Sequence, residues 1–159
     1  MLVSLSWLKD LVQVDDSVDD LAERLSMAGF EVENIDDLSA RSQGVVVGHV
    51  LTRDKHPNAD KLSVCTVDIG EKESVQIVCG AANVRAGIHV PVATVGAVLP
   101  AVDLTIKAGE LRGVASNGMI CSLSELGLTA ESSGIAILED TTKEIPAVGT
   151  PVAALFGLD

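Results

Sequence analysis

The chain has 159 residues, which is enough for one ordinary domain or for a small barrel with a further fragment. Because 47% of the residues are apolar but only 2% are aromatic, the core must be built from Val, Ile, Leu and Ala. A net charge of −12 argues at first sight against a nucleic-acid binder, and the richest apolar run, residues 90–102, contains two prolines and is too short to span a membrane. Three widely spaced cysteines and the lack of a basic N-terminal region favour a cytoplasmic protein with reduced thiols over a secreted, disulfide-linked or zinc-binding one.

The first 41 residues predict a small arm of two helices and a strand. A first helix is expected from about Ser6, and a second follows Ser17, a good N-cap, and stops at Gly29. Residues 30–35 then alternate between apolar and polar side chains, which predicts a strand. This arm is too small to be stable alone, so it must pack against the remainder of the chain or against a longer polypeptide.

After a polar stretch at 36–43, which we interpret as a domain boundary, the pattern changes to short β segments separated by glycines. The segments expected as strands are 45–52, 62–69, 74–79, 89–94, 104–107 and 135–138. Many short strands of β-branched residues at this spacing predict a small closed or partly open barrel over residues 42–150. Residues 146–156 are expected to lead back to the N-terminal arm.

The stretch from 111 to 128 contains the most distinctive candidate site. Arg112 and Gly113 precede a run of small residues, and Ser122 begins a short helical turn. Small residues with free backbone N–H groups beside a cation let a phosphate or sugar surface approach closely. The simpler interpretation is a tight turn between two strands, closed by a Ser-capped helical turn.

Two further segments contain candidate binding residues. Residues 56–62 join the first two strands and place His56 between Lys55 and Lys61, where a solvated hairpin connection is the simpler interpretation. Residues 77–85 end in a small-residue turn followed by Arg85. Neither segment has the arrangement of a metal site, a phosphate loop or an activated cysteine, because no base is singled out near any thiol.

Residues 42–150 contain no Phe, Trp or Tyr, and they carry 8 Lys and Arg against 12 Asp and Glu. Barrels that hold single strands without sequence preference usually stack bases on aromatic rings. A nucleic-acid ligand would therefore have to be read through the backbone and shape of a folded RNA, by cations, hydroxyls and main-chain N–H groups.

Four ordered motifs, H-P-N-A-D-K-L (56–62), Q-I-V-C-G-A-A-N-V-R (76–85), V-P-V-A (90–93) and L-R-G-V-A-S-N-G-M-I-C-S-L-S-E-L-G-L (111–128), resemble the EMAP-type tRNA-binding domain. The segments V-S-L-S-W-L-K-D-L-V (3–12) and L-A-E-R-L-S-M-A-G-F-E-V-E (21–33) resemble the start of the bacterial phenylalanyl-tRNA synthetase β subunit. One departure is L-P-A at 99–101, where the family often has glycine after the proline.

The resemblance implies a mainly β fold with an α+β arm. A five-stranded OB-fold barrel over 42–150, with a short helix near 122–126, would be inserted into a partial N-terminal domain formed by 1–41 and resuming at 151–159. The implied tRNA-binding face comprises Lys55, His56, Lys61, Asn83, Arg85, Lys107, Arg112, Ser116, Met119 and Ser122.

The parent family implied by the resemblance is a ligase, using ATP and magnesium, that joins phenylalanine to tRNA(Phe) as a tetramer of two α and two β subunits. Its catalytic, editing and main anticodon-contacting domains lie elsewhere, so we expect no catalytic residue, metal or cofactor in these 159 residues. We predict a tRNA-binding module without membrane contact. The alternatives are an architectural barrel that packs against other synthetase domains with little RNA affinity and, less favoured, an oligosaccharide- or peptide-binding barrel.

Overall fold

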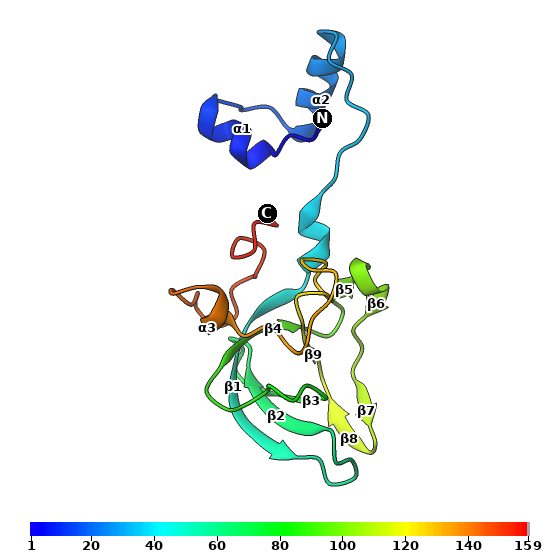
Figure 1. Ribbon diagram of the computed structural model, residues 1–159, viewed down its shortest axis with the longest axis vertical. Helices are drawn as coiled ribbons and strands as arrows, with labels where there is room; N and C mark the ends of the chain where they lie inside the picture. Colours follow the sequence, from blue (N-terminus) through cyan, green and yellow to red (C-terminus); the bar gives the residue numbers. More distant parts are fainter. Residues whose placement is uncertain (159) are drawn as a thin grey trace. The chain divides into compact units, whose positions relative to one another are not determined.

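The computed structural model describes residues 1–158, and the chain divides into two compact units, Met1–Asp37 and a second unit that begins at Leu38 (Figure 1). The division falls within the polar stretch 36–43. None of the helices among the described residues is long and apolar enough to cross a membrane.

The first unit contains the two helices that the sequence predicts. Helix α1 spans Leu5–Leu11 and helix α2 spans Val18–Met27. The backbone N–H of Asp20 donates to the hydroxyl of Ser17 at 3.2 Å, which confirms the predicted cap. Gly29 follows α2 with a φ of +95°, a left-handed conformation that ends a helix and that glycine adopts without strain.

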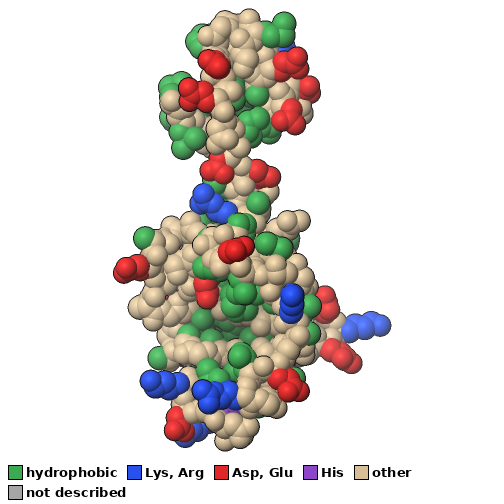
Figure 2. Space-filling model, turned by 90° about the vertical axis from the view of Figure 1, so that its right-hand side faces the viewer, with side chains coloured by type: hydrophobic (Ala, Val, Ile, Leu, Met, Phe, Trp, Pro, Cys, Tyr) green, Lys and Arg blue, Asp and Glu red, His purple; other side chains and the backbone are tan. Residues whose placement is uncertain are grey.

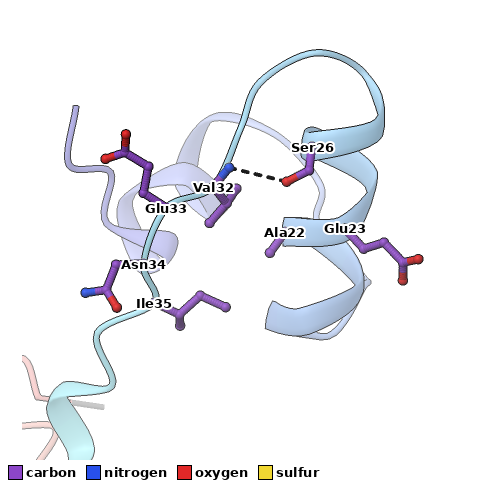
Figure 3. A pocket seen from close by; sticks show the side chains of 7 residues that line it. All are labelled: Ala22, Glu23, Ser26, Val32, Glu33, Asn34 and Ile35. Atoms are coloured by element: carbon purple, nitrogen blue, oxygen red, sulfur yellow. Dashed lines mark hydrogen bonds between the residues drawn. The ribbon is translucent and has the colours of Figure 1, made fainter.

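The prediction of a strand at 30–35 is wrong, because no strand forms there. Its backbone is bonded instead to the end of α2: the N–H of Phe30 donates to the Leu25 carbonyl at 2.9 Å, and that of Val32 donates to the Ser26 hydroxyl at 3.3 Å. Figure 3 shows Val32 and Ile35 beside Ala22, lining a shallow hollow against the helix. Val32 is half-buried against the helix, whereas Phe30 and Ile35 are exposed, and no strand in the described part of this unit is available to pair with this segment.

The second unit is built on a five-stranded antiparallel sheet in the order β3-β2-β1-β4-β9. Its strands are β1 (Val45–Lys55), β2 (Ser63–Asp68), β3 (Val75–Cys79), β4 (His89–Ala93) and β9 (Met119–Ile120). Two short hairpins lie between β4 and β9 in sequence: β5 (Val98–Leu99) with β6 (Leu104–Thr105), and β7 (Gly109–Leu111) with β8 (Val114–Ser116). The residues after β5 that depart from the family pattern form a short 3-10 helix, Pro100–Val102.

The sheet curls into a nearly closed barrel because β3 meets the chain around β8. The N–H of Asn117 donates to the Gln76 carbonyl at 2.8 Å, and the Gln76 side chain donates to the Ala115 carbonyl at 2.8 Å. Between them, the N–H of Val78 donates to the hydroxyl of Ser116 at 3.0 Å. These three contacts form the barrel seam. The predicted mainly β fold with a five-stranded barrel is confirmed.

Branched aliphatic side chains fill the barrel, as the low aromatic content requires. The inner cluster includes Val50, Val67, Ile77, Val90, Val92 and Ile120, and a second cluster includes Val45, Val47, Leu99, Leu126, Leu138 and Val152. Each such side chain contributes about 1.5–3 kcal/mol when fully buried. Gly48 in β1 has no room for a side chain, because a Cβ there would lie 2.5 Å from Val92 Cγ2. The barrel therefore depends on a glycine where two strands pack closely.

The predicted strand at 135–138 is wrong. Ile135 and Ile137 are buried in the inner cluster, but their segment has no strand structure, and Leu138 begins a four-residue helix, α3 (Leu138–Thr141). The apolar pattern reflects burial against the barrel. In place of a strand ladder, the N–H of Ala136 donates to the Cys121 carbonyl at 3.0 Å, and the main chain of Ile135 bonds to the Asn83 side chain.

Residues 122–128 form hydrogen-bonded turns and no regular helix. Their first turn is held by a capping box, in which the N–H of Glu125 donates to the Ser122 hydroxyl at 3.2 Å and the N–H of Ser122 donates to the Glu125 carboxylate at 2.6 Å. The predicted Ser-capped turn is present, whereas the short helix implied by the family resemblance is absent from this segment.

The C-terminal segment is hydrogen-bonded to β1. The N–H of Val47 donates to the Thr150 carbonyl at 2.8 Å, and the N–H of Val152 donates to the Val45 carbonyl at 3.2 Å. Val152 is fully buried in the second cluster, so this segment completes the core of the second unit. A discontinuous domain formed by 1–41 and 151–159 stays a prediction.

Candidate nucleic-acid interface

Cations gather at the tip of the hairpin formed by β1 and β2. Arg53, Lys55 and Lys61 line a hollow of about 450 Å³. The remaining lining consists of Asp60, Leu62, Ser63 and the small residues 80–82. In Figure 2, Lys and Arg side chains are grouped at the lower end of the barrel. Small residues and cations around one depression allow a phosphate-bearing surface to approach closely.

The three cations differ in how they are held. The Arg53 side chain donates through Nε to the Ser63 hydroxyl at 3.0 Å, which fixes its position across the two strands. Lys55 Nζ lies 3.6 Å from the Asp60 carboxylate, and both side chains are exposed, so this ion pair is weak and leaves Lys55 accessible. Among residues 1–158, no hydrogen bond or ion pair occupies the side chain of Lys61.

The tip of the β7–β8 hairpin lies against the tip of the β1–β2 hairpin (Figure 1). His56 Nε2 is 2.9 Å from the Leu111 carbonyl, and the Asn58 side chain donates to the Arg112 carbonyl at 3.0 Å. Arg112 and Gly113 have φ values of +51° and +82°, the left-handed pair that a two-residue hairpin turn requires. The structure thus brings Arg112 to the loop that carries Lys55 and Lys61. We call these three cations, together with Arg53, the basic tip.

Five residues of the predicted face are tied into the barrel itself. His56 is 2% exposed, and the side chain of Asn83 both accepts from and donates to the main chain of Ile135. The remaining three are Ser116 in the barrel seam, Met119 against the second core cluster and Ser122 in the capping box. These contacts give the five residues a structural function, which their sequence patterns did not reveal. Their contact with RNA stays a prediction.

Arg85 and Lys107 are exposed, but no described hydrogen bond or ion pair joins them to the basic tip. Sequence reasoning also missed two residues of this end of the barrel, Arg53 and Asn58. The pattern from 51 to 55 lacks the inward-facing apolar residues of the first half of β1. Arg53 could have been identified from that break in the alternation. The contact of Asn58 with Arg112 spans 54 positions, so no local pattern could have revealed it.

The cysteines and histidines offer no reactive site. Burial raises the pKa of the Cys65 thiol to about 11 and that of Cys121 to about 12, and it also raises the pKa of Cys79. These thiols are protonated at neutral pH and therefore poor nucleophiles. His49 and His89 stack with ring centroids 4.5 Å apart, and His89 Nδ1 bonds to Glu139 at 2.6 Å. In the part of the chain that the structure describes, no three His, Cys, Asp or Glu residues form a candidate metal site.

The family model described as "Putative tRNA binding domain" matches residues 45–146, which is more than half of the chain. The chain belongs to this family. The match includes β1 and β9 and every segment of the basic tip.

Over its whole length the chain is similar to longer proteins. It is 99% identical over 159 residues to a protein of Synechococcus sp. (strain CC9902) named "Phenylalanine--tRNA ligase beta subunit", and 74% identical to one of the same name from Synechococcus sp. (strain CC9605). Each alignment covers 100% of this chain and 20% of the relative, so the chain spans about a fifth of the length of these curated relatives. A solved structure, "MetRS related protein from Pyrococcus horikoshii", is similar at a TM-score of 0.47 and 23% identity, over 68% of this chain and 87% of that one.

Proposed function

We propose that this chain is the tRNA-contacting module of a phenylalanine–tRNA ligase β subunit, and that it contributes to tRNA binding in the aminoacylation of tRNA(Phe). The observation that carries the proposal is the basic tip, where the turn that carries Arg112 is bonded to the loop between Lys55 and Lys61, although the two hairpins are distant in sequence. The family match and the relatives named above support the same function.

The expected mode of binding is contact with the sugar–phosphate backbone. The basic tip supplies four cations but no aromatic ring on which a base could stack, since residues 42–150 contain none. Lys and Arg contacts to phosphate position an RNA without reading its sequence. Recognition of tRNA(Phe) over other tRNAs would therefore depend on other parts of the enzyme.

The complete enzyme, in this proposal, is an ATP- and magnesium-dependent ligase of two α and two β subunits in the cytoplasm. This module would bind neither the nucleotide nor the metal and would not react with the amino acid. The raised thiol pKa values and the bonded histidines support a non-catalytic function. Its partners are tRNA(Phe) and, through the remainder of the β chain, the α subunit.

The test is a titration of the 159-residue chain with unmodified tRNA(Phe) at two salt concentrations. Three to four phosphate contacts give a log–log salt slope of about −2 to −3, so the affinity should fall about 15- to 60-fold between 50 and 200 mM salt. Binding without salt dependence would contradict the backbone-contact mode.

The net charge of −12 and the five predicted face residues that are held in the barrel favour a second function, an architectural barrel that packs on other synthetase domains. Absence of binding at both salt concentrations would support that alternative.

A further inference from the structure

We propose that His56 and Asn58 are positioning residues that hold Arg112 where it can contact RNA. The two side chains form a clasp between the β1–β2 and β7–β8 hairpin tips, and neither side chain needs to touch RNA itself. This inference rests on the proposed RNA-binding function and adds a mechanism for the geometry of its site. It separates His56 from the other members of the predicted binding face, because its ring is enclosed by protein.

The first half of the clasp is the imidazole of His56, which is 2% exposed and has both nitrogens bonded. The N–H of Asn58 donates to Nδ1 at 3.0 Å, so Nδ1 must be the unprotonated nitrogen. Nε2 therefore carries the proton and donates it to the Leu111 carbonyl at 2.9 Å. One neutral tautomer satisfies both bonds, and the ring fixes the loop after Lys55 to the last residue of β7.

The second half is the Asn58 side chain, which donates to the carbonyl of Arg112 itself at 3.0 Å. Arg112 is one of two non-glycine residues among residues 1–158 with a positive φ, +51°, which is unfavourable for a residue with a side chain. Gly113 follows at +82° and lies close to the same amide, since a Cβ on it would be 3.7 Å from Asn58 Nδ2. The two side chains of the clasp thus bond to the carbonyl that precedes Arg112, which belongs to Leu111, and to the carbonyl of Arg112 itself.

The consequence is a fixed backbone position from which the Arg112 side chain extends. Arg112 has no hydrogen bond or ion pair through its guanidinium among the described residues, so its side chain is available while its backbone is fixed. Fixing a contact group before binding reduces the entropy lost on association. Breaking the clasp should weaken RNA binding although the net charge of the protein is unchanged.

The experiment is a double-mutant cycle in the 159-residue chain, with unmodified tRNA(Phe) as the probe at low salt. Asn58→Ala removes the amide bond to Arg112, and His56→Phe keeps a buried ring but removes both hydrogen bonds. Each is expected to weaken binding about 3- to 10-fold, and neither should weaken it further in an Arg112→Ala background, because residues that act through one another are not additive. Asn34→Ala, an exposed asparagine of the first unit outside the predicted binding face, is the matched control and should bind like the wild type.

A readout that does not need RNA measures the clasp directly. Trypsin cleavage after Arg112, followed by mass spectrometry, should be faster in Asn58→Ala than in the wild type and the control, because the hairpin turn is released. Circular dichroism identifies any variant that fails to fold.

The outcomes separate the two proposals. If the wild type binds RNA but both clasp variants bind equally well, or their losses add fully to that of Arg112→Ala, the positioning inference is wrong and the RNA-binding function stands. If the wild type does not bind, the proposed function fails and the inference fails with it, whatever the rate of trypsin cleavage.

Discussion

At the scale of single residues, asparagine has different functions in different loops of this barrel. Asn58 bonds to the turn that carries Arg112, whereas Asn83 bonds to both main-chain groups of Ile135 and fixes the segment before α3 to the barrel. Both follow turn-forming sequences, and the sequence alone suggested ligand contact for Asn83. The difference lies in which distant backbone each amide meets.

Asn83→Ala tests this distinction. We expect it to lower the free energy of unfolding by about 1–3 kcal/mol, because the main-chain groups of Ile135 lose their partners in a partly buried site. Urea denaturation measures the change, with Asn34→Ala, an exposed asparagine of the first unit, as the control. The affinity for tRNA(Phe) should stay within error of the wild type. A stable variant with weakened RNA binding would instead place Asn83 in the interface.

Lys61→Ala and Arg112→Ala address the cations of the basic tip. Each should weaken RNA binding and reduce the magnitude of the log–log salt slope by about 0.7–0.9, because one phosphate contact is lost. Thermal unfolding should be unchanged, since neither side chain has a described protein partner. Lys143→Ala, an exposed cation near α3, is the matched control. Unchanged affinity in both test variants would remove the basic-tip model.

The buried thiols allow a prediction that does not involve RNA. Because burial raises the pKa of Cys65 to about 11 and of Cys121 to about 12, both are almost fully protonated at pH 8. A thiol-specific disulfide reagent at that pH should react slowly with the native protein, and all three cysteines should react rapidly in denaturant. Fast reaction of a native thiol would show that the barrel opens readily.

At the scale of elements, the barrel is closed by side chains as much as by a strand ladder. The hydroxyl of Ser116 accepts the N–H of Val78, and the amide of Gln76 reaches the Ala115 carbonyl. The stretch from 111 to 128 therefore completes the barrel seam and also displays Arg112 at its hairpin tip. The simpler interpretation of that stretch, a tight turn between two strands, is confirmed, and RNA contact by the cation on that turn stays a prediction.

The docking of α3 on β4 predicts a dependence of stability on pH. Burial raises the pKa of Glu139, but hydrogen bonds from His89 outweigh it and hold the pKa below its ordinary value of 4.5. A carboxyl with a lowered pKa in the folded state stabilises that state above pH 4.5, and the stabilisation is lost as the pH falls through the folded-state pKa.

We therefore expect wild type to be more stable than Glu139→Gln at pH 7, and the difference to shrink below pH 4.5. Urea midpoints measured across this range test the prediction. Asp140→Asn, a neighbouring exposed carboxyl in α3, is the control. A difference that is constant with pH would show that the Glu139 carboxylate is not linked to folding.

At the scale of the whole molecule, net charge was a poor guide to local potential. The protein has a net charge of −12, yet four cations lie at one end of the barrel. The electrostatic influence of these cations extends over about 10 Å at moderate salt. In the proposed function, RNA contact depends on this local arrangement, and the remaining acidic charge would oppose unspecific binding of nucleic acid elsewhere on the surface.

The two units should also differ in autonomy. Neither α1 nor α2 contains a buried residue, whereas the second unit holds both hydrophobic clusters. We expect residues 38–159 to fold alone with a cooperative thermal transition, and residues 1–37 to lack stable structure alone. Circular dichroism of the two separate segments tests this. A disordered spectrum from the longer segment would contradict the assignment.

The sequence by itself determined the elements whose signals are local. The cap at Ser17, the stop at Gly29 and the four long strands of the barrel follow from hydrogen bonding within a few residues and from apolar alternation. The ordered motifs also sufficed to recognise the family. Local patterns failed at 30–35 and 135–138. The apolar residues at 135–138 are buried against the barrel without pairing as a strand, whereas Phe30 and Ile35 stay exposed and only Val32 is half-buried.

Only the tertiary structure decided which site residues meet. Lys55, Lys61 and Arg112 are brought to one end of the barrel by the bonds of His56 and Asn58, and Ser116 is occupied in the seam. The contact between the loop at 56–58 and the turn at 111–113 joins residues 54 positions apart, which meet only in the folded barrel. A side chain's availability for a ligand depends on such distant partners, and residue type and spacing do not encode them.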